Sequence, residues 1–231
     1  MRCDHFDAGT CRSCSLLPQP YERQLAGKAE AVAATLSPVL GADEIAWLAP
    51  ASSPQKGFRT SAKLVVGGTR RRPTLGILGP DRRGIDLPGC PIQHPAINRA
   101  TPGLKRFIRS LSLTPYDVPT KRGELKNILI TVGAGEQLMI RFVLRTRKRV
   151  SDIRSALPLL RNLVPSAHVV TANIHPTHEA IVEGPDEIIL SKRRMLPIRA
   201  GDLDLTLGPG SFIQTNAAVA GEVSLLPFND D

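Results

Sequence analysis

The chain has 231 residues, of which 42% are hydrophobic and 22% charged, a composition ordinary for a globular protein. No apolar run approaches the roughly 20 residues that a membrane helix needs, and the polar N-terminus lacks the apolar core of a signal peptide. We therefore expect a cytoplasmic protein with no membrane partner. Aromatic residues are only 4% of the chain, which argues against an aromatic platform for single-stranded bases.

The positive charge of the chain is concentrated in its middle. The formal net charge is +9, but residues 56–161 alone hold 22 basic and six acidic side chains, a local net charge of +16. The segments on either side are both net acidic. A basic block of this kind favours contact with the phosphate backbone of nucleic acid. The alternative is a solvated basic face with no partner.

Three of the four cysteines, Cys3, Cys11 and Cys14, lie within the first fourteen residues, and Cys90 stands alone 75 residues further on. A zinc ribbon normally has two C-x2-C pairs, whereas this sequence has one. Three clustered cysteines plus a remote cysteine followed by proline resemble iron–sulfur ligation more than zinc ligation. Zinc stays open as an alternative, and so does His5 as a substitute ligand.

The spacing of apolar residues predicts the secondary structure that follows. Residues 21–36 have helical spacing, and Ser37-Pro38 is expected to end this helix. The further predicted elements are, in order, strands at 62–67 and 74–78, a helix within 91–112, strands at 126–132 and 138–145, a helix over 150–163 kinked or divided at Pro158, and strands at 167–174 and 187–190. Hairpin-paired strands with a few helices indicate an α+β or mixed α/β fold with an antiparallel sheet.

Basic side chains are grouped beside these predicted strands. Arginine and lysine bind phosphate, and arginine also stacks on bases. The candidates for RNA contact from these groups are Arg59, Lys63, Arg122 and Lys126. For the segment RTRKR (145–149), a solvated face is an equally good interpretation.

Seven segments, taken in order, carry a resemblance to a known family. They are MRCDHFDAGTCRSCSLLPQPYERQLAGK at the start, GFRTSAKLVV (57–66), LPGCPIQHP (87–95), LTPYDVPTKRGELKNILIT (113–131), MIRFVLR (139–145), NIHPTHEAIVEG (173–184) and SFIQTN (211–216). Together they resemble the bacterial 23S rRNA uracil-C5-methyltransferases, in the short subfamily that lacks an N-terminal TRAM domain. The likeness covers nearly the whole chain.

This resemblance implies roles for particular residues. It implies that the cysteines hold a structural [4Fe-4S] cluster, with Cys3, Cys11, Cys14 and Cys90 as ligands. It also implies that Arg59 lies near the RNA, that Gln214 contacts S-adenosylmethionine and that Phe212 lies at the flipped base. Methylation at C5 of uracil requires the base to leave its stack, so these residues would surround an extruded nucleotide.

The resemblance also implies a division of the chain. Residues 1–95 are expected to form an iron–sulfur region with basic strands, and 96–209 an RNA-recognition region of the same domain. Residues 210–231 would begin a Rossmann-like methyltransferase domain that is absent beyond its first linker, because the family's cofactor loop and nucleophilic cysteine are not found.

From these observations we expect a [4Fe-4S] RNA-binding fragment of an S-adenosylmethionine-dependent rRNA m5U methyltransferase. Its S-adenosylmethionine site would be incomplete and it would be inactive alone, with no catalytic residue of its own. The expected partners are 23S rRNA and, if the enzyme is completed in trans, a separate chain carrying the methyltransferase domain. The alternative is a non-enzymatic RNA-binding module stabilised by an iron–sulfur cluster or zinc.

Overall fold

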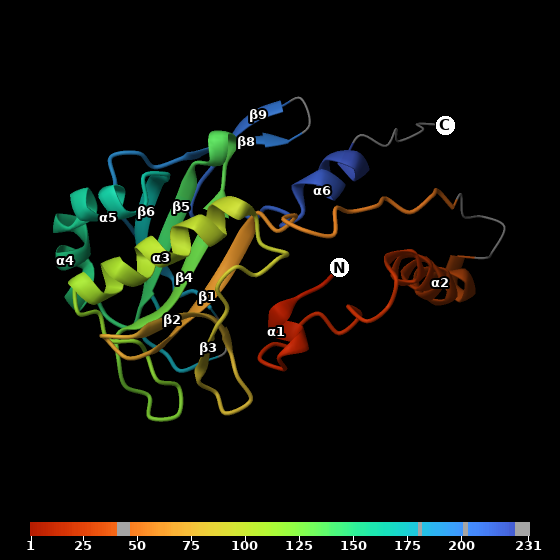
Figure 1. The fold of residues 1–231 in the computed structure, drawn as a ribbon. Helices are drawn as coiled ribbons and strands as arrows, with labels where there is room; N and C mark the ends of the chain where they lie inside the picture. Colours follow the sequence, from red (N-terminus) through yellow and green to blue (C-terminus); the bar gives the residue numbers. More distant parts are fainter. Residues whose placement is uncertain (41–46, 180–181, 201–202, 225–231) are drawn as a thin grey trace.

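A seven-stranded sheet lies at the centre of the computed structural model, which describes residues 1–40, 47–179, 182–200 and 203–224 (Figure 1). The strands are ordered β3-β2-β1-β4-β5-β6-β7 across the sheet. Their bounds are β1 (Ser61–Gly68), β2 (Pro73–Leu78), β3 (Gly84–Asp86), β4 (Leu125–Val132), β5 (Leu138–Leu144), β6 (Ala167–Ile174) and β7 (Asp186–Ile189). Every neighbouring pair is antiparallel except β5 and β6, which pair in parallel.

The sequence predicted an antiparallel sheet, and the parallel pairing of β5 with β6 shows that this prediction was partly wrong. Parallel strands need a crossover connection, and here α4 (Val150–Ser155) and α5 (Leu157–Leu163) provide it between β5 and β6. The predicted helix over 150–163 is divided in two. Pro158 lies in the first turn of α5, where its missing N–H breaks no helical hydrogen bond.

Helix α3 (Pro95–Ser110) packs its apolar face against the sheet. Its buried side chains recur at helical spacing, and they are Ala96, Ile97, Ala100, Leu104, Phe107 and Ile108. The ring of Phe107 lies 5.6 Å from that of Phe142 on β5, centroid to centroid. Burying a side chain of this size stabilises a fold by roughly 1.5–3 kcal/mol, so this interface is a principal source of stability.

The N-terminal segment lies beside the sheet and buries very little. It contains α1 (Asp4–Asp7) and α2 (Tyr21–Leu40), and Cys3 is the one buried residue among positions 1–39. Helix α2 runs through the predicted stop at Ser37-Pro38, because a proline so close to a helix end removes only one backbone hydrogen bond. Apolar side chains on α2 remain open, with Val39 79% exposed.

A small hairpin completes the described fold. Strands β8 (Leu196–Ala200) and β9 (Leu203–Leu207) pair with each other, and Leu196, Ile198 and Leu207 pack on Met139 and Val169. Helix α6 (Ala217–Ser224) follows, and residues 225–231 of the predicted methyltransferase start lie outside the described residues. Within the described ranges, no helix combines the length and apolarity needed to cross a membrane.

Candidate functional site

All four cysteines line one small cavity between the N-terminal loop and the loop that precedes α3. Phe6, Leu87, Pro91 and Ile92 supply its apolar walls. The loop positions are held by the backbone: the Cys90 carbonyl accepts hydrogen bonds from Gln93 N at 3.1 Å and from Asn98 Nδ2 on α3 at 3.0 Å. The four thiols therefore converge although 75 residues separate Cys14 from Cys90.

The cavity raises the pKa of two of its thiols. Burial raises the pKa of Cys14, with a further contribution from the neighbouring cysteines, while Arg59 acts in the opposite direction. Burial also raises the pKa of Cys90, although the backbone N–H groups of Ile92 and Gln93 lower it in part. A metal-free protein would therefore hold these thiols protonated, and a bound metal would have to displace the protons.

The donor set of the cavity fits a cluster better than a single zinc ion. Around zinc, four thiolates lie about 2.3 Å from the metal, so their sulfurs come within roughly 4 Å of one another. Among the described residues, no three histidine, cysteine or acidic side chains are arranged to hold one metal ion. Four soft thiols around one apolar cavity, with N–H groups directed at Cys90, match the ligand set of an iron–sulfur cluster.

His5 also lines this cavity, but its imidazole is engaged elsewhere. Its Nε2 lies 2.7 Å from the carbonyl oxygen of Pro88, a contact that joins the N-terminal loop to the Cys90 loop. The histidine thus acts here as a link between the two loops that bear the cysteines.

Arg59 lies between the loop that contains Cys90 and the segment that contains Gln214. Its N–H donates to Ile92 O at 2.9 Å, and its carbonyl accepts from His94 N at 2.9 Å. On the other side, Arg59 forms an isolated bridge with Asn216, and the N–H of the next residue donates to Thr215 O at 2.8 Å. Three segments far apart in the sequence are therefore joined at one point.

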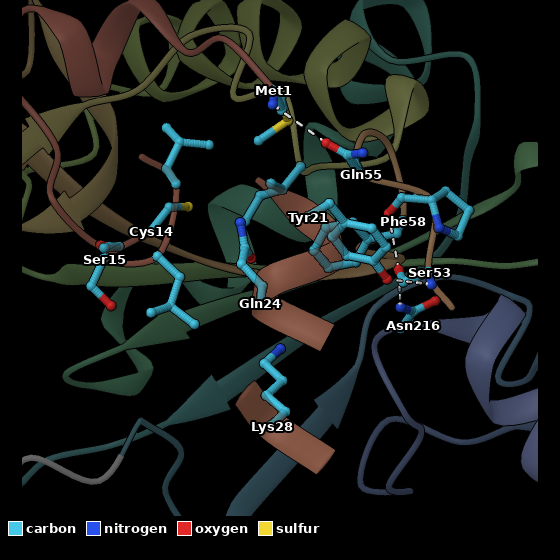
Figure 2. A pocket seen from close by; sticks show the side chains of 15 residues that line it. Met1, Cys14, Ser15, Tyr21, Gln24, Lys28, Ser53, Gln55, Phe58 and Asn216 are labelled. Carbon is cyan, nitrogen blue, oxygen red and sulfur yellow. Dashed lines mark hydrogen bonds between the residues drawn. The ribbon is translucent and has the colours of Figure 1, made fainter. Parts of the chain in front are cut away.

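A hollow of about 360 Å³ adjoins the cysteine cavity (Figure 2). Figure 2 shows Tyr21, Phe58 and Asn216 gathered on one side of it and Cys14 on the other. The Tyr21 hydroxyl accepts a hydrogen bond from Ser53 N at 2.7 Å, and Asn216 Nδ2 donates to Ser53 Oγ at 2.6 Å. Its volume lies within the usual range of small-ligand pockets.

The other predicted contact residues are mostly exposed. Phe212 is 82% exposed, and Gln214, Lys63 and Arg122 are also open to solvent. Arg59 and Lys63 share one face of the chain because alternate residues of an extended strand point the same way. Arg122, in contrast, lies in the loop before β4 rather than beside Arg59.

Lys126, the remaining candidate for RNA contact, has a buried side chain. It is buried, and its ammonium lies 2.6 Å from His175 Nδ1 and 4.9 Å from the ring centroid of Tyr116. Burial, and secondarily the charge of Arg145, lowers its pKa from 10.5 to about 8. A strand register shift at Leu125/Asn127 accompanies this placement, and the sequence gives no sign of it.

Sequence reasoning missed several residues of these sites. Tyr21, Ser53 and Asn216 line the adjoining hollow, yet Ser53 and Asn216 alone are 163 residues apart in the sequence. No local spacing signals such a contact. Asn216 is part of the SFIQTN segment, which was the single available clue.

The chain is similar in sequence to curated RNA methyltransferases. It is 41% identical over 225 residues to "23S rRNA (uracil(747)-C(5))-methyltransferase RlmC" of Enterobacter sp. (strain 638), and 42% identical over 225 residues to the protein of the same name from Escherichia coli O139:H28. Each alignment covers 96% of this chain, and the chain spans 59% of the length of these curated relatives. No protein-family model matches the chain.

A solved structure shares the fold. It is the Pyrococcus abyssi tRNA (uracil-54, C5)-methyltransferase in complex with S-adenosyl-L-homocysteine, with a TM-score of 0.67 and 21% identity. The match covers 92% of this chain and 48% of that one.

The fold class predicted from the sequence is therefore wrong. The prediction was an iron–sulfur domain with an antiparallel sheet and without a methyltransferase fold. Its mixed seven-stranded sheet and flanking helices are those of a methyltransferase fold. The strand spacing indicated hairpins correctly, but it carried no signal for the parallel pair or for the fold to which the sheet belongs.

Proposed function

We propose that the chain belongs to the RNA uracil-C5-methyltransferases and serves the methylation of a uridine in 23S rRNA, with S-adenosylmethionine as methyl donor. The identity of 41–42% to proteins of that name supports the proposal. The observation that carries it is the junction at Arg59. There the cysteine loop, the first strand and the segment of Phe212 and Gln214 are bonded together through the backbone.

The proposed contacts follow from this junction. Arg59 and Lys63 would hold RNA phosphates, with Arg122 as a further contact, while exposed Phe212 would lie at the extruded base and Gln214 at S-adenosylmethionine. Lys126 is left out because its ammonium is buried against His175. A cytoplasmic location remains part of the proposal.

We propose further that the cysteine cavity holds a structural [4Fe-4S] cluster through Cys3, Cys11, Cys14 and Cys90. The cluster would join the N-terminal loop to α3 by metal–thiolate bonds. The methyl transfer itself is not a redox step. The cluster would therefore act structurally. It would hold the N-terminal loop in place, and with it one wall of the hollow beside Arg59.

This assignment has a consequence for activity. The sequence has four cysteines and all of them line the cavity, so none would remain for covalent attack on C6 of uracil. We expect these 231 residues to bind rRNA without transferring a methyl group. The same fact favours the second candidate function, an RNA-binding module without catalysis. The comparisons give no support to a separate chain carrying a methyltransferase domain, and none is proposed.

The test is a pair of measurements on the chain purified without oxygen. Binding of a uridine-containing 23S rRNA hairpin is measured by fluorescence anisotropy, and methyl transfer by counting labelled methyl groups in the RNA. We expect binding that weakens about tenfold in Arg59→Ala, and no labelled product. The matched control is Arg161→Ala, which removes an exposed arginine on α5.

The outcomes separate the two functions. Labelled product would overturn the expectation of inactivity and establish the chain as a complete catalyst. Equal binding by the control and Arg59→Ala would remove Arg59 from the RNA site. No RNA binding at all would overturn both candidate functions.

A further inference from the structure

A second basic site lies at the other end of β1 from Arg59. Thr69, Arg70, Arg71, Arg109 and Ser112 line a hollow of about 570 Å³ there. Figure 1 shows the β1–β2 turn near the last turn of α3, away from α1 and the cysteine loop. We call this site the arginine hollow.

The turn that presents two of the arginines is rigid. Thr69 N donates to Arg72 O and Arg72 N to Thr69 O, each at 3.1 Å, which leaves Arg70 and Arg71 as a two-residue tip. Gly68 precedes them with φ +70°, and a Cβ there would lie 2.3 Å from Arg72 O, so only glycine fits. The tip is therefore preorganised, and binding a ligand costs less backbone entropy.

The third arginine comes from a separate element with its own fixed geometry. Arg109 lies in the last turn of α3, where Ser112 N donates to Arg109 O at 3.0 Å and closes the helix end. Two independent elements thus contribute arginines to the lining of one hollow, together with the hydroxyl-bearing residues Thr69 and Ser112.

Some arginines elsewhere in the described structure are paired with carboxylates. Arg99 pairs with Glu136 at 2.5 Å and Arg147 with Asp186 at 2.8 Å. Among the described residues, Arg70, Arg71 and Arg109 have no hydrogen-bond acceptor or carboxylate partner, and no acidic side chain lines the hollow. The hollow is therefore lined by three positive charges and no negative one. A bound anion would balance them.

The residues that line the hollow also indicate which kind of anion it would bind. It has no aromatic or large apolar side chain against which a nucleobase would stack. Guanidinium forks bind phosphate oxygens bidentately, and hydroxyls add single hydrogen bonds. The volume is ample for more than one phosphate group, because pockets of about 300–1,000 Å³ hold whole small ligands.

The position of the hollow sets the length of the ligand. The eight residues of β1 span about 26 Å at about 3.3 Å per residue, and the sixteen residues of α3 span about 24 Å. An RNA that reaches both Arg59 and the arginine hollow must extend over this distance.

We infer that the arginine hollow binds the phosphate backbone of RNA about 25 Å from the nucleotide held near Arg59, as a distal anchor. This inference rests on the proposed rRNA function and deepens it. It explains why the basic block extends past the predicted contacts at Arg59 and Lys63.

The test compares two hairpin RNAs with the same uridine-containing loop. Their stems have about four and about fourteen base pairs, so that only the longer A-form stem extends over about 25 Å. The variant Arg70→Ala/Arg71→Ala/Arg109→Ala is compared with Arg99→Ala/Arg154→Ala/Arg161→Ala, which removes the same charge from exposed arginines elsewhere.

We expect the hollow variant to bind the long hairpin at least tenfold more weakly, with little change for the short one. The slope of log affinity against log salt should fall by roughly two to three, one for each lost contact. The control variant should lose much less, and an Arg→Lys version of the hollow should keep most of the slope. Unchanged far-ultraviolet circular dichroism checks that each variant is folded.

Equal losses in the two triple variants, or equal losses on both hairpins, would overturn the distal anchor. Loss of poly-glutamate binding with unchanged RNA binding would overturn it in favour of an acidic protein partner. If the unsubstituted chain binds neither hairpin, the proposed function itself fails. If the unsubstituted chain binds both hairpins and the hollow variant binds them equally well, only the distal anchor is ruled out.

Discussion

The sheet with α3 and the N-terminal segment of residues 1–40 differ in how much apolar surface they bury. Phe107, Phe142 and Leu104 are fully buried between α3 and the sheet, whereas Cys3 alone is buried among residues 1–39. The sheet can therefore fold by apolar packing alone. The N-terminal segment needs another source of free energy to hold its position.

The hydrogen bonds that join the N-terminal segment to the rest of the chain are modest in energy. They include His5 to Pro88 O and Tyr21 to Ser53 N, each worth about 0.5–1.5 kcal/mol net. The cysteine cavity is the place where the segment meets the sheet-bearing part of the chain through groups able to form strong bonds. On the proposed assignment, the cluster and not packing would order the N-terminus.

The largest expected effect is in the sheet core. Phe107→Ala removes a fully buried ring that contacts Phe142, and we expect the free energy of unfolding to fall by about 3–5 kcal/mol. Val39→Ala on α2 should change it by less than about 0.5 kcal/mol. Urea unfolding of both variants makes the measurement. Similar losses in the two would erase the distinction between the regions.

The second-largest expected effect on stability concerns the buried ion pairs of the sheet. Arg141 donates to Glu183 and Glu187, and Arg141→Met should cost about 2 kcal/mol because it leaves two half-buried carboxylates unpaired. Burial acts to raise the pKa of Glu187, but hydrogen bonds from Arg141, Thr171 and Asn173 lower it overall.

A lowered carboxyl pKa in the folded state gives stability that is present above pH 4.5 and is lost as the pH falls through the folded-state value. The unsubstituted protein should therefore lose stability more steeply below pH 4.5 than Arg141→Met. Parallel slopes in acid unfolding experiments would contradict this role of Arg141.

Lys126 provides a smaller effect that also rises with pH, but at the alkaline end of the scale. Its pKa of about 8 lies below the ordinary 10.5, so the folded protein releases this proton before the unfolded chain does. Stability from this group should rise between pH 8 and 10.5. The stability of the unsubstituted protein relative to Lys126→Met should increase by on the order of 1 kcal/mol over this range. A constant difference would show that Lys126 titrates normally.

Loss of one cysteine should have the smallest effect on the sheet. Cys90→Ser should change the unfolding midpoint of the sheet little, while residues 1–59 become sensitive to limited proteolysis. The matched control is Ser15→Ala, a change of an exposed side chain in the N-terminal loop. Mass spectrometry of the fragments locates the cuts. Equal resistance in Cys90→Ser would show that packing alone orders the segment.

The elements of the fold were largely predictable from the sequence, because apolar spacing controls them. The spacing in α3 and the hairpin of β4 and β5 is strong, and both agree with the structure. The three residues of β3 are too few to show any period. The parallel pairing of β5 with β6 depends on a crossover that spacing does not reveal.

The candidate site was predictable only where a motif marked it. Cys3, Cys11, Cys14 and Cys90 were selected by type and spacing, and the structure brings them to one cavity. The junction of Arg59 with Asn216 joins residues that are distant in sequence, which no local rule predicts. Lys126 was predicted to contact RNA, and the structure places it in a buried position next to a strand irregularity that the sequence does not signal.

The most direct test of the central claim is the content of iron, acid-labile sulfide and zinc in the chain purified without oxygen. The proposal predicts about four iron and four sulfide per chain, lost in Cys90→Ser and kept in Ser15→Ala. One zinc per chain without sulfide, or no metal at all, would contradict the cluster and leave the order of the N-terminal segment to some other cause.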